Sequence, residues 1–181
     1  MPPSIRWHSA TRALHWASSL LVVLCVGAVL TKGLFPKNGT ASHILMHDHM
    51  ALGLSIGALA VARLLVRTRH PAPNHNLPSG LRVAALAAQA ALYALMLLLP
   101  LAGYLAASGR GVPITLVLGW ALPPLPVAAP LAHAALELHR AAAWGLIGLA
   151  LLHAAAGLYH HVVRKDDVLR SMLWPSRSKP E

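Results

Sequence analysis

Four long runs of apolar residues, separated by short polar or Pro- and Gly-rich stretches, dominate the chain. The first run, residues 13–31, has about 19 mostly apolar residues, the length that a helix needs to cross a bilayer. A signal peptide has a shorter apolar core of about 7–15 residues before its cleavage site, so we interpret this run as a retained span. The pattern predicts one all-α domain, residues 1–181, folded as an integral membrane four-helix bundle, with spans at about 10–32, 41–66, 81–107 and 133–163.

The composition agrees with a membrane protein. Hydrophobic residues make up 56% of the chain and charged residues 11%, whereas soluble domains carry about 25% charged residues. The net charge of +10 could indicate nucleic-acid binding, but the basic residues flank apolar runs, which favours the membrane. Cys25 is the single cysteine, so the chain has no intrachain disulfide and no CxxC site, and we expect this residue to fill the core.

The basic residues predict the orientation of the spans. The first and third loops hold few of them, namely Lys32, Lys37 and Arg110. Most of the others lie in the N-terminus, around the second loop and in the tail: Arg6, Arg12, Arg63, Arg67, Arg69, Arg82, Arg164, Lys165, Arg170, Arg177 and Lys179. Cytoplasmic loops carry the excess of Lys and Arg, so we expect both termini to be cytoplasmic. The third loop, residues 108–132, is apolar and is expected to lie on the membrane surface, with a short helix around Leu116 to Ala121.

Twelve histidines are unusual in so apolar a chain, because ionisable groups in a bilayer are costly and tend to be functional. His139 and His153 lie fourteen residues apart in the last run. A helix turns through about 1400° over that distance and rises about 21 Å, so the two imidazoles share a face at different depths. The expected spans put His15 at the depth of His153 and His49 at the depth of His139, which predicts the pairs His15/His153 and His49/His139.

Each histidine pair could hold one metal centre. Two axial imidazoles suit haem iron, whereas zinc needs about four ligands in a tetrahedron. We therefore predict two b haems, bound between helices 1 and 4 and between helices 2 and 4, and not covalently attached because no CxxCH motif is present. Small residues follow the ligands at helical spacing and would leave room for a porphyrin, although they could equally serve close helix packing: Gly53, Gly57, Ala143 and Gly157.

His47 competes with His49 as the ligand on the second span. His47 lies two residues before it, about 200° around the helix, so only one of them faces the bundle axis. The residues four and eight positions after His49 are glycines, which favours His49. His43 and His47 are spaced i,i+4 and could form a small external metal site, but we interpret them as interfacial polar residues.

Several motifs resemble the bacterial cytochrome b561 family, the four-helix dihaem cytochromes of the inner membrane. They are LHW at 14–16, His49 with Gly53 and Arg63 after it, the His139–His153 spacing, and HAAAGLYHHVVRKDDVLRSM at 153–172. The resemblance covers nearly the whole chain, and the last motif is specific. It implies a multi-pass protein of the bacterial inner membrane in which His15, His49, His139 and His153 are the axial ligands of two haem irons.

The resemblance also implies an activity. Similar proteins pass electrons between the external face and the quinone pool, and the best-defined activity is superoxide oxidation with ubiquinone as acceptor, a superoxide:ubiquinone oxidoreductase. His160 lies two turns beyond His153 on nearly the same face, so it is a candidate quinone-binding residue, or else an interfacial histidine that orders the helix end. Four basic residues could attract the superoxide anion or simply meet lipid headgroups: Lys32, Lys37, Arg110 and Arg140.

Two other functions compete with superoxide oxidation. The chain could be a cytochrome b subunit that links a partner dehydrogenase or hydrogenase to the quinone pool, or a non-redox membrane protein such as a metal transporter. Basic residues near the predicted cytoplasmic haem could pair with its propionates or anchor the helices: Arg63, Arg67, Arg164 and Lys165. Asp166 and Asp167 are expected to balance the basic tail.

Overall fold

Four long helices form the molecule, and the computed structural model describes residues 6–73, 78–116 and 119–173. The helices are α1 (Ser9–Lys32), α2 (Thr40–Arg69), α3 (Ser79–Ser108) and α4 (Ala129–Tyr159). The last helix continues into a π-helical turn, η1 (His160–Arg164), and a short 3₁₀ helix, η2 (Arg170–Met172), follows in the tail. All four helices are long and apolar enough to cross a membrane, so the predicted fold class is confirmed. Arg177 and Lys179 lie outside the described residues.

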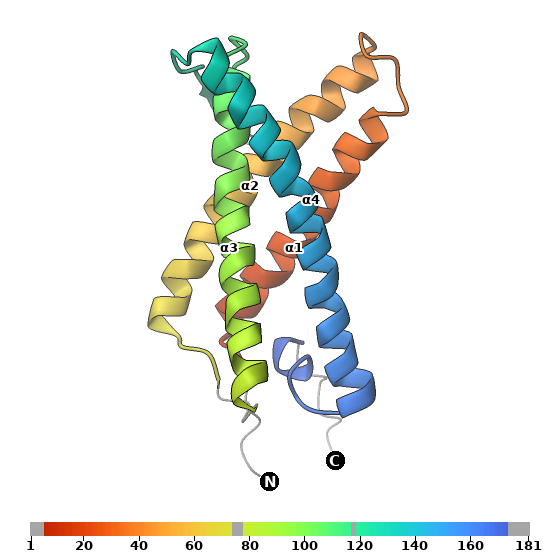
Figure 1. The fold of residues 1–181 in the computed structure, drawn as a ribbon, viewed down its shortest axis with the longest axis vertical. Helices are drawn as coiled ribbons and strands as arrows, with labels where there is room; N and C mark the ends of the chain where they lie inside the picture. The colour runs from red at the N-terminus through yellow and green to blue at the C-terminus, as the bar shows by residue number, and fades with distance from the viewer. Residues whose placement is uncertain (1–5, 74–77, 117–118, 174–181) are drawn as a thin grey trace.

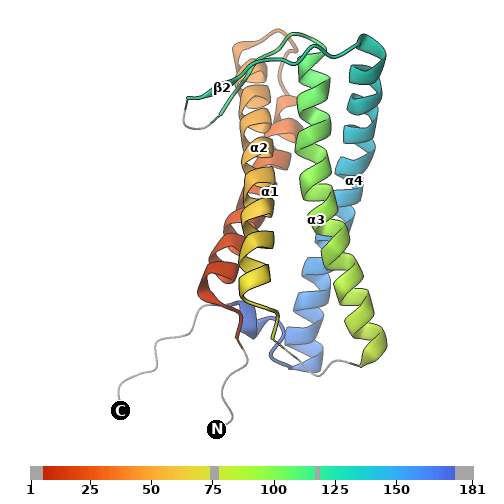
Figure 2. The same ribbon diagram turned by 90° about the vertical axis from the view of Figure 1, so that its left-hand side faces the viewer.

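The helices pack as two hairpins. α1 lies along α2 and α3 lies along α4, and the two layers meet mainly where α2 contacts α3 (Figure 2). The layers cross at an angle, so their ends diverge on one side of the molecule (Figure 1). The start of α1 and the end of α4 lie at what we call the tail end, and the opposite end, which carries a small β-hairpin, is the hairpin end. A buried cluster between the layers forms the core: Cys25, Ile56, Ala60, Met96, Leu99 and Leu146.

Small residues set how closely the helices approach. A Cβ atom on Gly57 of α2 would lie 3.1 Å from Cγ of Pro100 in α3, so this glycine serves helix packing rather than room for a cofactor. A Cβ atom on Gly109, at the end of α3, would overlap the methyl group of Ala132 in α4. By contrast, a Cβ atom on Gly53 would meet nothing within 4 Å, so the space beside this glycine stays open.

The third loop forms a β-hairpin, and the short helix expected around Leu116 to Ala121 is wrong. The described part of the loop has β1 (Ile114–Thr115) paired antiparallel with β2 (Ala121–Leu122). Pro113 directly before β1 cannot donate a backbone hydrogen bond, and the two β1 residues are β-branched, which favours a strand. Gly119 adopts a φ of 79°, which glycine tolerates and which closes the turn.

The hairpin is attached to the bundle at two points. The side chain of Ile114 is buried, and β1 packs against α2. The hydroxyl of Tyr104 in α3 donates to the carbonyl of Pro123 at 2.6 Å. Trp120 remains 77% exposed, as expected of an aromatic ring that lies at a membrane interface.

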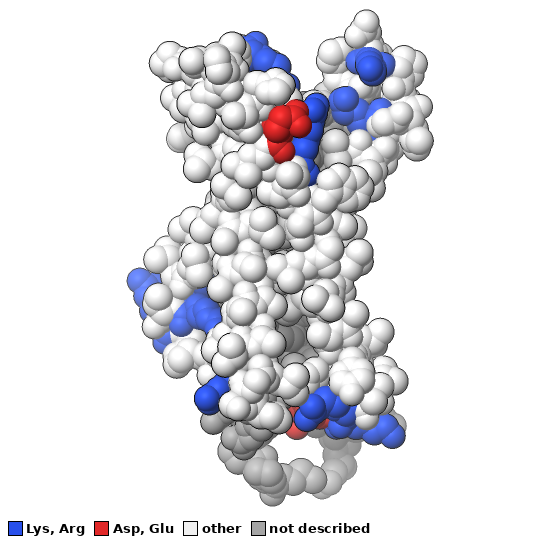
Figure 3. Space-filling view, in the orientation of Figure 1, with Lys and Arg blue, Asp and Glu red and all other residues white. Residues whose placement is uncertain are grey.

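Charged side chains gather toward the two ends of the molecule. On the face shown in Figure 3, the middle carries no Lys, Arg, Asp or Glu, which matches the hydrocarbon region of a bilayer. In the described chain the basic residues are unequally divided. Four lie at the hairpin end (Lys32, Lys37, Arg110 and Arg140) and nine toward the tail end (Arg6, Arg12, Arg63, Arg67, Arg69, Arg82, Arg164, Lys165 and Arg170).

The contact between α3 and α4 at the hairpin end yields a first prediction. Gly109→Ala adds a methyl group where that of Ala132 already lies, and overpacking of this kind costs about 1–3 kcal/mol. We expect a lower Tm for Gly109→Ala in detergent, followed by circular dichroism. Gly145→Ala is the matched control, because no atom lies within 4 Å of its Cβ position. Equal Tm values for the two variants would contradict the close packing.

Candidate functional site

Two histidine pairs join the helix layers at different depths. At the tail end His15 of α1 faces His153 of α4, with ring centroids 6.2 Å apart and ring planes at 68°. Nearer the hairpin end His49 of α2 faces His139 of α4, with centroids 6.0 Å apart and planes at 84°. Thus α4 contributes one imidazole to each pair, while α1 and α2 contribute one each.

The separation of the rings is suited to one metal ion between them. Imidazole nitrogens bind metals at about 2 Å, and each nitrogen lies about 1 Å from its ring centre, so two imidazoles on opposite sides of a metal have centres about 6 Å apart. In the described part of the chain, no three His, Cys, Asp or Glu side chains come together as a metal-binding group. A two-imidazole site needs further ligands from elsewhere, as a porphyrin would supply.

Backbone carbonyls orient both rings of the hairpin-end pair. Nδ1 of His139 lies 2.9 Å from the carbonyl oxygen of Leu99 in α3, and Nδ1 of His49 lies 3.0 Å from that of Cys25 in α1. A carbonyl can only accept, so Nδ1 carries the proton in both rings. That tautomer leaves Nε2 as the nitrogen with a free lone pair, which is how metal-binding histidines are usually held.

The sequence reasoning missed these supporting residues. Cys25 was expected only to fill the core, and it is buried, but its thiol also lies 3.3 Å from Nδ1 of His49. Gly103 of α3 leaves room for His139, because a Cβ atom there would lie 3.2 Å from two atoms of the imidazole. Every residue has a backbone carbonyl, so no sequence pattern could have identified those of Leu99 and Cys25 as the partners of the two histidines.

Arg63 of α2 lies beside the tail-end pair. Its guanidinium is 3.2 Å from Nδ1 of His15 and lies over the ring of Tyr93 in α3, 5.0 Å from the centroid. Its Nε atom is buried and has no hydrogen-bond partner in the described chain. A buried cation with an unused donor calls for an acidic acceptor at this position.

His160 lies at the end of α4, beyond the tail-end pair. Its Nδ1 atom is 2.6 Å from Oδ2 of Asp166, and its side chain is 14% exposed. Arg164 lies 3.4 Å from the same carboxylate oxygen. Asp166 is therefore part of a specific contact, whereas the sequence reasoning treated it only as charge balance for the tail.

The other histidines at the hairpin end stay away from the pairs. His43 is exposed. Nδ1 of His47 lies 3.6 Å from a carboxylate oxygen of Asp48, and both of these side chains are about half exposed, at 49% and 51%. Of the two competing histidines, His49 is therefore the one that the structure places against α4.

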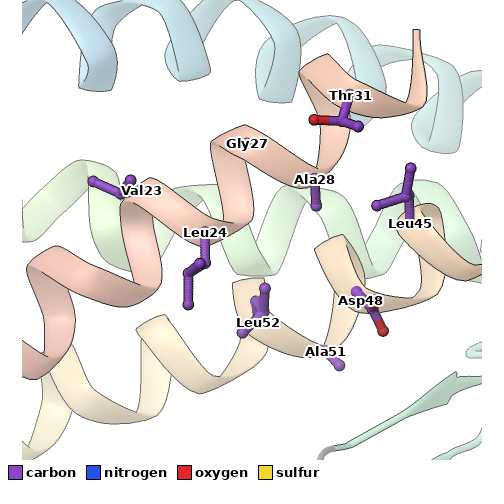
Figure 4. Close-up of a pocket in the computed structure, with 9 residues that line it drawn as sticks. All are labelled: Val23, Leu24, Gly27, Ala28, Thr31, Leu45, Asp48, Ala51 and Leu52. Carbon is purple, nitrogen blue, oxygen red and sulfur yellow. The ribbon is translucent and has the colours of Figure 1, made fainter. Parts of the chain in front are cut away.

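Two grooves on the bundle surface lie apart from the histidine pairs. The larger, about 590 Å³, runs between α1 and α2 and is lined mainly by apolar side chains, with Asp48 and Thr31 at its hairpin-end side (Figure 4). The smaller, about 480 Å³, lies between α2 and α3, where Arg67 donates to the side chain of Gln89 at 2.9 Å. None of the four paired histidines lines either groove.

Comparison with known proteins adds a family likeness to this geometry. Residues 6–175 match the family model described as prokaryotic cytochrome b561. The chain is 33% identical to cytochrome b561 homolog 2 of Escherichia coli K12, over 96% of this chain and 94% of that protein. It is 31% identical to cytochrome b561 homolog 1 of the same organism, over 88% and 92%. It is also similar to cytochrome b562 of Cereibacter sphaeroides, at 29% identity over 90% and 91%.

The contact of Asp166 predicts a pH dependence of stability. Burial would raise the pKa of this carboxyl group, but hydrogen bonds from His160 and the Val168 amide, with the charges of His160 and Arg164, outweigh it and lower the pKa below 3.8. A group with a lowered folded-state pKa stabilises the protein above its unfolded pKa and loses this contribution as pH falls through the folded value. We expect Asp166→Asn to lower the Tm near neutral pH, and the difference to shrink as pH falls below about 4 and through the lowered pKa of Asp166.

Asp167→Asn is the matched control for this measurement. Asp167 pairs with Arg170 at 3.8 Å and is 73% exposed, and such surface pairs contribute little. A Tm difference for Asp166→Asn that stays constant from neutral pH to pH 3 would contradict the lowered pKa of Asp166.

Proposed function

The chain belongs to the prokaryotic cytochrome b561 family, and on this premise we propose that it carries electrons across the bacterial inner membrane from periplasmic superoxide to ubiquinone through two b haems. Membership of the family makes it a multi-pass membrane cytochrome that binds b-type haem and transfers electrons. The observation that carries the finer proposal is the two facing histidine pairs, with ring centroids 6.2 and 6.0 Å apart, one toward each end of α4.

The residues fit two haems in this proposal. His15 and His153 would hold one iron near the tail end, and His49 and His139 would hold the other near the hairpin end. Bound haem supplies a one-electron couple whose potential the protein tunes. The carbonyls of Leu99 and Cys25 keep Nε2 of His139 and His49 available for the iron. The open side of Gly53 leaves space beside His49 for a macrocycle.

Arg63 is the side chain that would bind a propionate of the tail-end haem. An arginine can only donate, so while Arg63 contacts Nδ1 of His15 that nitrogen must accept, and Nε2 then carries the proton. Iron binding at Nε2 requires the proton to move to Nδ1 and Arg63 to donate elsewhere. A propionate is an anion with two acceptor oxygens, and its pairing would also satisfy the buried Nε atom of Arg63.

The length of α4 suits transfer across the bilayer. His139 and His153 are separated by about 21 Å along the helix, most of the roughly 30 Å hydrocarbon core. The excess of basic residues around the tail end supports a cytoplasmic position for that end, and so for both termini. The hairpin-end pair would then receive electrons from the periplasm, and the tail-end pair would pass them to quinone.

The charges at the hairpin end support an anionic electron donor. Four basic side chains oppose two acidic ones there, Asp48 and Glu137, which leaves two positive charges in excess. Arg140 is 2.8 Å from Glu137, so its charge is compensated, and the exposed Lys37 and Arg110 remain the main attraction for superoxide. At the tail end, His160 is the candidate donor of a hydrogen bond to quinone. It lies on nearly the same face of the helix as His153, two turns further along.

Removal of single ligands tests the haem assignment. We expect His139→Ala and His153→Ala each to lose about half of the haem per protein, because two axial imidazoles are needed to hold each b haem. Haem content is measured by the pyridine haemochrome assay and related to protein mass. His133→Ala, an exposed histidine on the same helix, should keep its full haem content. Full haem content in either ligand variant would contradict the pairing.

The electron donor is tested by mixing oxidised protein with superoxide in a stopped-flow or pulse-radiolysis experiment. We expect the absorption bands of reduced haem to appear far faster in the unaltered protein than in His139→Ala. The double variant Lys37→Gln/Arg110→Gln should react with superoxide ~2–10-fold more slowly at low salt, because it lacks two cations that attract the anion. Haems that stay oxidised under a superoxide flux would remove superoxide as donor. Co-purification with a flavin or iron–sulfur protein that reduces the haems would then favour an electron-transfer subunit.

A further inference from the structure

An unusual turn of the backbone brings the carboxylate of Asp166 into contact with His160. The chain leaves α4 through the π-helical turn η1, and Lys165 after it adopts a left-handed conformation with φ 54°. Both features are uncommon for ordinary residues, and π-helical turns occur often at functional sites. The amide of Asp166 then donates to the carbonyl of His160 at 3.2 Å, which returns the aspartate side chain to the imidazole.

Hydrogen bonds from α1 hold the segment after Asp166 against the tail end of the bundle. The indole of Trp16 in α1 donates to the carbonyl of Met172 at 3.0 Å, and Arg12 donates to that of Leu173 at 2.8 Å. The Val168 amide donates to Oδ1 of Asp166 at 3.2 Å, which fixes the carboxylate plane. These contacts hold Asp166 in one position, whereas an ordinary tail carboxylate would be free to rotate in solvent.

A cation and an aromatic ring lie against the pair of Asp166 and His160. Arg164, on the same turn, lies 3.4 Å from Oδ2 of Asp166, and Arg12 is the cation that α1 presents to the docked tail. The ring of Tyr159 stands edge-on to His160, with centroids 6.2 Å apart. Asp166 is 30% exposed and His160 is 14% exposed, so the carboxylate reaches the aqueous side while the imidazole lies behind it.

We propose that Asp166 is a positioning residue for quinone reduction, which holds His160 with Nδ1–H toward the carboxylate and Nε2 toward the quinone as the proton-donating atom. This inference rests on the proposed function, because it takes ubiquinone as the electron acceptor. A carboxylate that accepts from Nδ1–H fixes the imidazole tautomer and balances the charge of the imidazolium, as in other aspartate–histidine pairs.

His160 would supply one of the two protons that quinone reduction consumes. Reduction of ubiquinone to ubiquinol takes two electrons, which the proposed function supplies from the tail-end haem, and two protons. The N–H bond at Nε2 of protonated His160 breaks as an O–H bond forms at one quinone carbonyl oxygen. The imidazole that remains is neutral, with Nδ1–H still donating to Asp166. Water at the tail end returns the proton to Nε2 and supplies the second proton to the other quinone oxygen.

The test follows the reaction from reduced haem to quinone, which makes it independent of the external donor. The full-length haem-loaded protein is reduced with dithionite and mixed anaerobically with decylubiquinone, and haem oxidation is recorded in H₂O and in D₂O over a range of quinone concentrations. Asp166→Asn keeps the size of the side chain but removes the negative charge that faces Nδ1–H and replaces one acceptor oxygen with an NH₂ donor. We expect oxidation at saturating quinone to slow by ~10-fold or more, because the amide favours the other tautomer.

Two controls separate positioning from structure. Asp167→Asn removes a neighbouring charge of the same tail and should oxidise within ~2-fold of the unaltered protein, because its ion pair is exposed. Unchanged haem spectra in both variants show that the bundle is intact. If proton transfer is impaired, the ratio of the oxidation rate in H₂O to that in D₂O, here called the D₂O effect, is larger for Asp166→Asn than for the unaltered protein.

The possible outcomes distinguish the inference from the function on which it rests. Equal rates for Asp166→Asn and Asp167→Asn, with the unaltered protein oxidised by decylubiquinone, overturn the role of Asp166 and leave the proposed function standing. A higher half-saturating quinone concentration with an unchanged maximal rate and D₂O effect also overturns it, since that pattern marks a structural role. Unaltered protein that decylubiquinone does not oxidise overturns ubiquinone as the acceptor, and the inference with it.

Discussion

Nδ1 of His139 donates to the carbonyl of Leu99 at 2.9 Å, and Nδ1 of His49 donates to that of Cys25 at 3.0 Å. An imidazole in hydrocarbon needs partners for its polar atoms, because the membrane offers no water. One nitrogen of each ring is satisfied by the backbone of a third helix, α3 for His139 and α1 for His49. In the proposed function, a haem iron between the two layers would bind this second nitrogen of each ring.

This constraint explains the composition of α3, the one long helix of the described chain that carries none of the four paired histidines. α3 has no imidazole in its span, yet it supplies the carbonyl that orients His139 and the glycine, Gly103, that admits the ring. Pro100 lies next to Leu99 and packs against Gly57, which fixes the height of α3 against α2. The precise placement of one proposed ligand on α4 therefore depends on small residues and backbone atoms of its neighbour.

Much of this architecture can be predicted from the sequence, because it follows from periodicity. The four helices follow from apolar runs long enough to span a bilayer, and the shared face of His139 and His153 follows from helix geometry. The β-hairpin could not be predicted as readily, since Ile114 is held by packing against α2, a tertiary contact. The contact between Asp166 and His160 was also missed, because it depends on a π-helical turn and a left-handed Lys165 that no sequence pattern encodes.

The partners of the histidines differ between the two ends, and that difference argues for a division of chemistry. At the hairpin end the acceptors of Nδ1 are carbonyls, which cannot take up or release a proton in the physiological range. At the tail end the acceptor for His160 is a carboxylate with access to water. Oxidation of superoxide to oxygen requires the removal of one electron and no proton, whereas reduction of a quinone consumes two protons. A protein that performs both would need a proton donor only at the end that reduces quinone. The tail end is where this chain places the hydrogen-bonded pair of Asp166 and His160, at 2.6 Å, whereas His47 and Asp48 at the hairpin end are about half exposed and lie 3.6 Å apart.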